Sequence, residues 1–238
     1  MNDNFINISL STETLDIYYV RRSILKAIEK SLPYLRGELL DIGCGKMPYK
    51  DLILKNSAVS NYVGLDIDTA IIYDEFIRPD LVWDGKKMPC DVDSFDCAIG
   101  TEVLEHCPYP EIVLSEVYRV LKPGGVFLFT VPFLWNLHEV PNDEYRYTPF
   151  SLRRHLLDVG FVSVEIFPTG GWHASLAQML GLWVMRAPIS VRNRRILSKV
   201  LKPIISWLIK KDKTTKIEFT EGQMITGMYG IAKKLNNE

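Results

Sequence analysis

Two glycines and an acid follow a short apolar run and can form a ligand-binding turn. Leu39 and Leu40 precede Asp41, and Gly43 and Gly45 come directly after it. A strand that enters a glycine-rich turn before a helix is typical of a nucleotide site, because the backbone can approach the ligand closely. An ordinary turn between a strand and a helix is the alternative interpretation.

The charge of Asp41 indicates what kind of ligand the turn would bind. A dinucleotide fingerprint would require a third glycine at position 48, which is Pro48. A carboxylate at the strand end repels a pyrophosphate and attracts an ammonium group. The sequence therefore predicts a ligand with a positive end and opposes a nicotinamide-dependent dehydrogenase.

A second acid ends the next apolar run. Asp66 lies 21 positions after Gly45, followed by Ile67. An acid at that distance can accept hydrogen bonds from ribose hydroxyls. S-adenosylmethionine carries an ammonium group, a sulfonium and a ribose-adenine tail, and it fits both acids.

Five motifs together resemble one enzyme family. They are D-I-G-C-G (41–45), G-L-D (64–66), S-F-D (94–96), E-V-L-E-H (102–106) and R-V-L-K-P-G-G (119–125). From about Leu39 to Phe167 the chain resembles class I S-adenosylmethionine-dependent methyltransferases of the small-molecule type 11 group. The resemblance implies an α/β fold with a Rossmann-like, doubly wound, seven-stranded sheet and S-adenosylmethionine as the cofactor.

The resemblance also assigns further cofactor contacts. In this family an acid at the tip of the third strand accepts a hydrogen bond from the adenine amino group, which points to Asp84 with Gly85 beside it. A turn-forming Asp-Gly pair is the alternative there. Thr101 and Glu102 follow the strand expected at 95–100, at the sheet edge where such folds bind ligands.

The long segment from Pro132 to Pro149 is the candidate for catalysis, because it is aromatic and charged and leaves the same edge. We predict that His138 is the base that removes a hydroxyl proton, with Glu139 or Asp143 orienting its ring. Arg146 would bind a polar or anionic acceptor. A structural hydrogen-bonded lid made by these residues is the alternative, and a carbon acceptor would need no base.

Two other histidines are weaker candidates. His106 follows the strand at 95–100, and a histidine there more often makes a local hydrogen bond. His173 opens the segment after Phe167 and is a second candidate base.

Composition restricts the class of protein. The chain has 238 residues, a net charge of −1 and 47% hydrophobic residues, which suits one α/β domain and gives no field that attracts nucleic acid. Its four cysteines lack paired spacing, so we expect neither zinc nor disulfides. With no signal peptide and no run of about 18 apolar residues, we expect a cytoplasmic protein.

The expected elements divide the single methyltransferase domain into four parts. These are an N-terminal helical cap (1–36), a cofactor-binding core (37–168), a basic helical insertion (169–222) and a closing strand (223–234). The cap contains a helix from about 12 to 31. The core contains strands at 38–42, 61–66, 79–85, 95–100, 126–131 and 161–167, and helices at 48–54, 69–75, 109–121 and 149–159. Gly124 and Gly125 are expected to end the helix at 109–121, and Thr148 to cap the helix at 149–159.

The insertion is basic and apolar at once. Residues 190–213 contain eight Lys or Arg and one acid, Asp212. This composition suits a helix pair on anionic lipid at the inner face of the plasma membrane. A packing or homodimer helix with a solvated basic face is the alternative.

The function expected from this resemblance is O-methylation of a sugar or lipid-linked saccharide. The loop pattern P-F-x-W-x-x-H-E-x-P-x-D-x-x-R-Y-T (132–148) and the G-G-W-H-A run (170–174) resemble enzymes linked to bacterial surface-polysaccharide assembly. The alternatives are a C- or O-methyltransferase of a quinone or secondary metabolite, and a non-catalytic protein that keeps the cofactor pocket.

Overall fold

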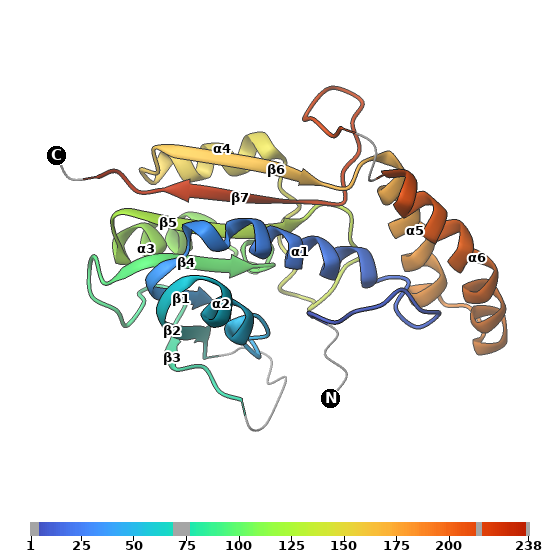
Figure 1. Ribbon diagram of the computed structural model, residues 1–238, viewed down its shortest axis with the longest axis horizontal. Helices are drawn as coiled ribbons and strands as arrows, with labels where there is room; N and C mark the ends of the chain where they lie inside the picture. Colours follow the sequence, from blue (N-terminus) through green and yellow to red (C-terminus); the bar gives the residue numbers. More distant parts are fainter. Residues whose placement is uncertain (1–4, 69–76, 213–215, 237–238) are drawn as a thin grey trace.

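The computed structural model describes residues 5–68, 77–212 and 216–236, and it combines strands with helices (Figure 1). The helix expected at 69–75 lies outside the described residues. The strands are β1 (Arg36–Ile42), β2 (Ala58–Ile67), β3 (Leu81–Trp83), β4 (Phe95–Thr101), β5 (Leu121–Pro132), β6 (Ser163–Thr169) and β7 (Gly227–Lys233). The α-helices are α1 (Tyr18–Ser31), α2 (Lys50–Asn56), α3 (Pro110–Val120), α4 (Pro149–Asp158), α5 (Trp172–Arg186) and α6 (Val191–Asp212), and the 3-10 helices are η1 (Leu32–Tyr34) and η2 (Leu104–His106).

All seven strands form one sheet in the order β3-β2-β1-β4-β5-β7-β6. The first five are parallel, whereas β7 is antiparallel and lies between β5 and β6. The order reverses at β1 and β4, so the carboxyl ends of these strands open the crevice in which doubly wound sheets bind ligands. The predicted seven-stranded Rossmann-like fold, with two helices inserted before the last strand, is confirmed.

Helices cover both faces of the sheet (Figure 1). On one face Ile24 and Ile28 of α1 pack with Ile53 of α2 against buried residues of β1 and β4. On the other face α3 and α4 supply Val117 and Leu152 to a larger core. Alternating residues of β4 enter different cores, as expected for a strand buried on both sides.

Helices α5 and α6 form a hairpin beyond the end of the sheet (Figure 1). Their contact surface is a separate core that includes Val184, Ile205 and Leu208, together with Leu15 of the N-terminal segment. Asp212 at the end of α6 is buried and accepts hydrogen bonds from the backbone N–H groups of Gly171 and Ala174, each at 3.1 Å. It therefore caps the start of α5, where a carboxylate is also favoured by the helix dipole.

The structure corrects several predicted boundaries, including the starts of the following three elements. The N-terminal helix begins at Tyr18 rather than near residue 12, and the residues before it form a turn in which the Ser11 backbone N–H donates to the Thr14 hydroxyl and that hydroxyl donates to the Ser9 carbonyl. Strand β5 begins at Leu121, so Gly124 and Gly125 lie inside it rather than ending a helix. The closing strand begins at Gly227 rather than 223.

The helix at Pro149–Asp158 confirms the predicted cap. The Thr148 side chain accepts a hydrogen bond from the Ser151 backbone N–H at 3.2 Å, and the Ser151 hydroxyl accepts one from the Thr148 backbone N–H at 3.2 Å. Within the described residues, no helix is long and apolar enough to cross a membrane.

Candidate active site at the carboxyl edge of the sheet

The glycine turn between β1 and α2 requires glycine for two reasons. Gly43 has φ +62° and Gly45 has φ +48°, a region that residues with a Cβ rarely adopt. A Cβ on Gly43 would also lie 2.5 Å from a methyl group of Val103. The turn is therefore shaped by its backbone and packed closely against the segment that follows β4.

Asp66 at the end of β2 is bonded to this turn. One of its oxygens accepts the Gly45 N–H at 2.9 Å, and the other accepts the Ile67 N–H at 2.9 Å. Ile67 itself is exposed at the sheet edge. Without a ligand, the predicted ribose-binding acid thus holds the turn.

Asp41 is almost fully enclosed, with 3% of its surface exposed. The Tyr62 hydroxyl donates a hydrogen bond of 2.5 Å to its carboxylate. Burial raises the pKa of Asp41 to about 7, because the charged form is poorly solvated, and Asp66 adds a smaller effect in the same direction. A cationic group beside Asp41 would lower this pKa again.

Asp84 and Gly85 follow β3 at the same edge. The exposed Asp84 carboxylate accepts the backbone N–H groups of Lys86 and Lys87 at 2.9 and 3.1 Å, and these bonds lower its pKa. Gly85 has φ +77°. Asp84 and Gly85 therefore form a turn, as the alternative interpretation expected. The contact of Asp84 with adenine stays a prediction.

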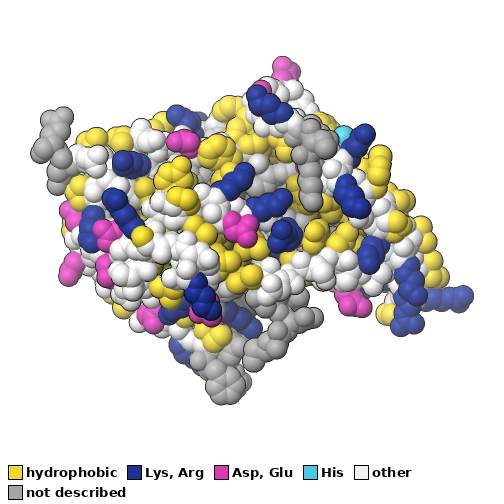
Figure 2. All heavy atoms as spheres, in the orientation of Figure 1, with side chains coloured by type: hydrophobic (Ala, Val, Ile, Leu, Met, Phe, Trp, Pro, Cys, Tyr) yellow, Lys and Arg dark blue, Asp and Glu magenta, His cyan; other side chains and the backbone are white. Residues whose placement is uncertain are grey.

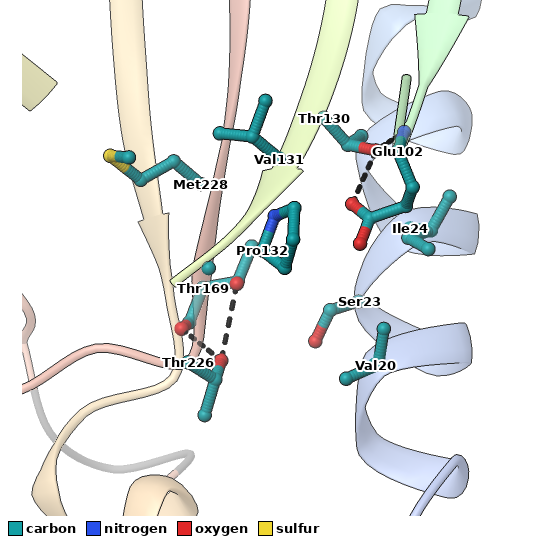
Figure 3. A pocket seen from close by; sticks show the side chains of 11 residues that line it. Val20, Ser23, Ile24, Glu102, Thr130, Val131, Pro132, Thr169, Thr226 and Met228 are labelled. Carbon is teal, nitrogen blue, oxygen red and sulfur yellow. Dashed lines mark hydrogen bonds between the residues drawn. The ribbon is translucent and has the colours of Figure 1, made fainter. Parts of the chain in front are cut away.

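Thr101 ends β4, and Glu102 follows it with φ +56°, a strained backbone for a residue with a side chain. The Thr130 hydroxyl donates to the Glu102 carboxylate at 2.8 Å, and burial raises the pKa of Glu102 (Figure 3). Arg21 of α1 and Arg146 both lower this pKa by their charge. The Glu102 side chain faces a small cavity that α1 closes from one side.

The structure brings together the three predicted catalytic residues. Arg146 binds both oxygens of Asp143 at 2.6 and 2.9 Å, and this pairing lowers the pKa of Asp143 to about 2. The backbone N–H of His138 donates to Asp143 at 3.1 Å, and the His138 Nδ1 lies 3.3 Å from the same carboxylate. Burial lowers the pKa of His138, which keeps the imidazole neutral and able to accept a proton.

Sequence reasoning did not assign a role to Glu105, which the fold places beside His138. Glu105 has no exposed surface, and neither carboxylate oxygen has a hydrogen-bond partner. Burial, followed by the charge of Glu102, raises its pKa well above the usual range. Glu105 belongs to the E-V-L-E-H motif, which marks it as a candidate site residue. The motif does not indicate that the later loop brings His138 next to Glu105.

His106 also belongs to this part of the site. Its ring centre lies 4.7 Å from that of His138, and its Nε2 lies 3.8 Å from Glu105. The backbone carbonyl of Glu105 accepts the N–H groups of Glu144 and Tyr145 at 2.9 and 3.0 Å. These bonds fasten the loop at 133–147 to the end of β4.

A groove of about 230 Å³ runs along α1 and is also lined by residues of β6, β7 and α6. Three basic residues spaced by four on α1 line it, as do three tyrosines: Arg22, Lys26, Lys30, Tyr18, Tyr19 and Tyr229. Figure 2 shows Lys and Arg side chains gathered over this helix. Ser23 and Thr169 line both this groove and the cavity that contains Glu102, so the two spaces adjoin.

Comparisons with known proteins agree on the type of domain. A family model described as a methyltransferase domain of type 11 matches residues 40–129. A malonyl-[acyl-carrier protein] O-methyltransferase of Alcanivorax borkumensis is 27% identical over 53% of this chain and 45% of its own length. A sterol 24-C-methyltransferase of Aspergillus fumigatus is 32% identical over 46% of this chain and 31% of its own length. The chain thus spans less than half of these curated relatives.

The fold is also that of a solved S-adenosylmethionine-dependent methyltransferase from Archaeoglobus fulgidus. That structure superposes with a TM-score of 0.54 at 19% identity and covers 90% of this chain and 93% of its own. At this identity the likeness concerns the fold. The matched region from 40 to 129 contains the glycine turn, Asp66, Glu102 and Glu105.

Proposed function

We propose that this chain, whose residues 40–129 match a methyltransferase-domain family model, is a class I S-adenosylmethionine-dependent methyltransferase that methylates a hydroxyl group of a negatively charged sugar or lipid-linked saccharide. The acceptor oxygen would form a bond to the methyl carbon while the carbon–sulfur bond breaks, and the bonding pair would stay on sulfur. The products are the methyl ether and S-adenosylhomocysteine.

The basic groove beside Glu102 is the observation that supports this acceptor. Arg22, Lys26 and Lys30 lie along one face of α1, where their charges favour a phosphate or carboxylate. Tyrosine rings on the same walls offer flat apolar surfaces for a sugar ring. The groove adjoins the cavity at the end of β4, so an acceptor held in the groove reaches the sheet edge.

The cofactor assignments form part of this proposal. Asp41 would bind the ammonium group, and Asp66 with Ile67 the ribose. Asp84 and Gly85 would contact the adenine, and the turn at Gly43 and Gly45 would let the backbone approach the ligand. Thr101 and Glu102 would complete the site at the end of β4.

We assign the hydroxyl proton to His138 in this proposal. Methyl transfer is an in-line displacement, so the protein mainly orients the acceptor and removes its proton. The Asp143 carboxylate, held by Arg146, fixes the position of His138. The neutral imidazole can then take the proton as the new bond forms.

The outer surface of the α5–α6 hairpin supports a lipid-linked acceptor. Exposed apolar residues follow one stripe of α6 and one of α5: Ile196, Val200, Ile204, Trp207, Leu176, Met179 and Trp183. Basic residues accompany them on α6. This pairing of an apolar stripe with cations favours a surface of anionic lipid.

Methyl transfer from labelled cofactor to defined acceptors tests the proposal. We expect label in saccharides with a phosphate or carboxylate, and a KM about tenfold higher in the Arg22→Gln and Lys26→Gln variants with kcat little changed. Lys55→Gln, an exposed lysine of α2, is the matched control. Labelling of quinones but not saccharides, or equal KM values in all variants, would contradict it.

A further inference from the structure

Three side chains at the end of β4 and in the loop at 133–147 form a carboxylate–imidazole cluster. They are Glu105, His106 and His138, and one ligand atom of each lies within 4.8 Å of the others. Glu105 and His106 belong to η2, whereas His138 lies 32 positions after His106 along the chain. The cluster therefore exists only because the loop folds back onto the strand end.

Glu105 lacks the partners that a buried carboxylate requires. Both oxygens are enclosed and accept no hydrogen bond, and His106 Nε2 lies 3.8 Å from Glu105 Oε1. His138 Nδ1 has Asp143 Oδ2 beside it at 3.3 Å, so the group of the cluster without a partner is the Glu105 carboxylate. A buried polar group without a hydrogen bond is unfavourable, so the Glu105 carboxylate needs a partner that the described side chains do not supply.

His106 has the orientation that a metal ligand requires. Its Nδ1 lies 2.9 Å from the backbone carbonyl of Asn142, and since a carbonyl can only accept, Nδ1 carries the proton. The lone pair is then on Nε2, which faces Glu105 and lies 3.8 Å from Glu139. A backbone acceptor that holds the other ring nitrogen is the usual arrangement around metal-bound histidine.

We propose that Glu105, His106 and His138 bind a divalent transition-metal cation. Two imidazoles and one carboxylate suit Mn²⁺, Fe²⁺, Co²⁺, Ni²⁺ or Zn²⁺ better than Mg²⁺ or Ca²⁺, which prefer oxygen ligands. Three protein ligands leave positions open for an acceptor oxygen. The cation would neutralise Glu105 and hold the loop against β4.

The role of the cation rests on the proposed function and changes one of its steps. A hydroxyl bound to the cation has a much lower pKa, because the metal stabilises the alkoxide. His138 is then a ligand rather than the free base, and the hydroxyl proton leaves to water. The alkoxide oxygen attacks the methyl carbon, and sulfur keeps the electron pair of the broken bond.

Metal binding can be measured without any acceptor. We would treat the tag-free protein with EDTA, remove the chelator, and titrate it with CoCl₂ while recording visible absorbance and heat. We expect one Co²⁺ per chain, with affinity at least tenfold lower in Glu105→Gln and in His106→Ala. Glu111→Gln on α3 and His155→Ala on α4 are matched controls and should bind as the unmodified protein does.

A second measurement guards against loss of folding in the variants. Thermal unfolding with and without CoCl₂ should show a Tm increase in the unmodified protein and both controls, and none in Glu105→Gln or His106→Ala, whose metal-free transitions should stay cooperative. Absence of stoichiometric binding, or equal binding in all variants, would overturn the metal site. Binding as expected without methylation of any acceptor would refute the proposed function and leave the metal site standing.

Discussion

Asp41 and Glu105 are buried carboxylates in two different situations. The Tyr62 hydroxyl donates to Asp41, so the charged form of Asp41 has one partner in the absence of ligand. Neither oxygen of Glu105 has such a donor. Because burial disfavours both charges, each side chain is prepared for a cation, which the proposals identify as an ammonium group and a metal ion.

Cofactor binding should depend on the protonation of Asp41. Its pKa is about 7 in the unliganded protein, and an ammonium group beside it would lower that pKa, so binding below pH 7 must release a proton. Affinity should therefore rise with pH, by up to about tenfold per unit between pH 5.5 and 7. Calorimetric titration with S-adenosylmethionine at several pH values measures this slope.

The Asp41→Asn variant is the control for this slope. It has no proton to release at this position, so its weaker binding should lose this part of the pH dependence. Equal slopes in both proteins would show that Asp41 does not meet the ammonium group.

The loop at 133–147 has no regular secondary structure, but hydrogen bonds and an ion pair hold it in place. The Arg146–Asp143 pair holds it internally, and the backbone of Glu105 holds it to the end of β4. The structural network considered as an alternative for these residues is therefore present. It also serves the proposed catalytic role, since it fixes the place of His138.

Removing the Arg146 charge should weaken this loop in a pH-dependent way. Asp143 has a lowered pKa of about 2, so its stabilising effect is complete above its ordinary pKa of 3.8 and is lost as the pH falls through 2. We expect Arg146→Gln to reduce the free energy of unfolding by about 1–3 kcal/mol at pH 7. Denaturant unfolding at pH 7 and near pH 2 measures both values.

Arg153→Gln on α4 is the matched control. Arg153 donates to the backbone carbonyl of Val164, so this variant also loses an arginine hydrogen bond, but one that involves no carboxylate. Its effect should vary less with pH over this range. An Arg146→Gln deficit that stayed constant down to pH 2 would argue against the Asp143 pairing.

At the scale of the whole molecule, the α5–α6 hairpin extends the fold beyond the sheet (Figure 1). It is joined to the N-terminal segment by Arg186, which pairs with Asp16 at 2.7 Å, and by Gln178, which donates to the Asp16 backbone at 2.6 Å. The groove on α1 also includes Ile209 of α6. A lipid surface in contact with α6 would therefore lie near the proposed acceptor site.

Attachment of the hairpin to lipid predicts binding to vesicles that contain phosphatidylglycerol. Val200 and Trp207 are each 57% exposed, so an aspartate there should disrupt the apolar stripe without disturbing a core. We expect Val200→Asp and Trp207→Asp to lower co-sedimentation at least fivefold, and added salt to weaken binding of the unmodified protein.

Val92→Asp, at an exposed apolar residue outside the hairpin, is the matched control. Equal sedimentation of all variants would exclude the lipid surface. A dimer that Val200→Asp dissociates, in the absence of vesicle binding, would favour the packing alternative.

Local pattern by itself determined the order of strands and helices, the glycine turn and the Thr148 cap. These features depend on neighbouring residues: a short apolar run between turn residues predicts a buried strand, a positive φ selects glycine, and a hydroxyl before a helix satisfies its first N–H groups. The acids Asp41 and Asp66 could be located for the same reason, because each ends a strand of the predicted sheet.

Only the tertiary structure decided which distant side chains meet. Tyr62 reaches Asp41 from the next strand, Asp212 caps a helix that begins 40 residues earlier, and His138 joins Glu105 and His106. The boundaries of β5 and β7 also depended on their partner strands. Such contacts, and the protonation of a buried carboxylate, depend on what packs around each group, and that environment comes from other elements of the chain.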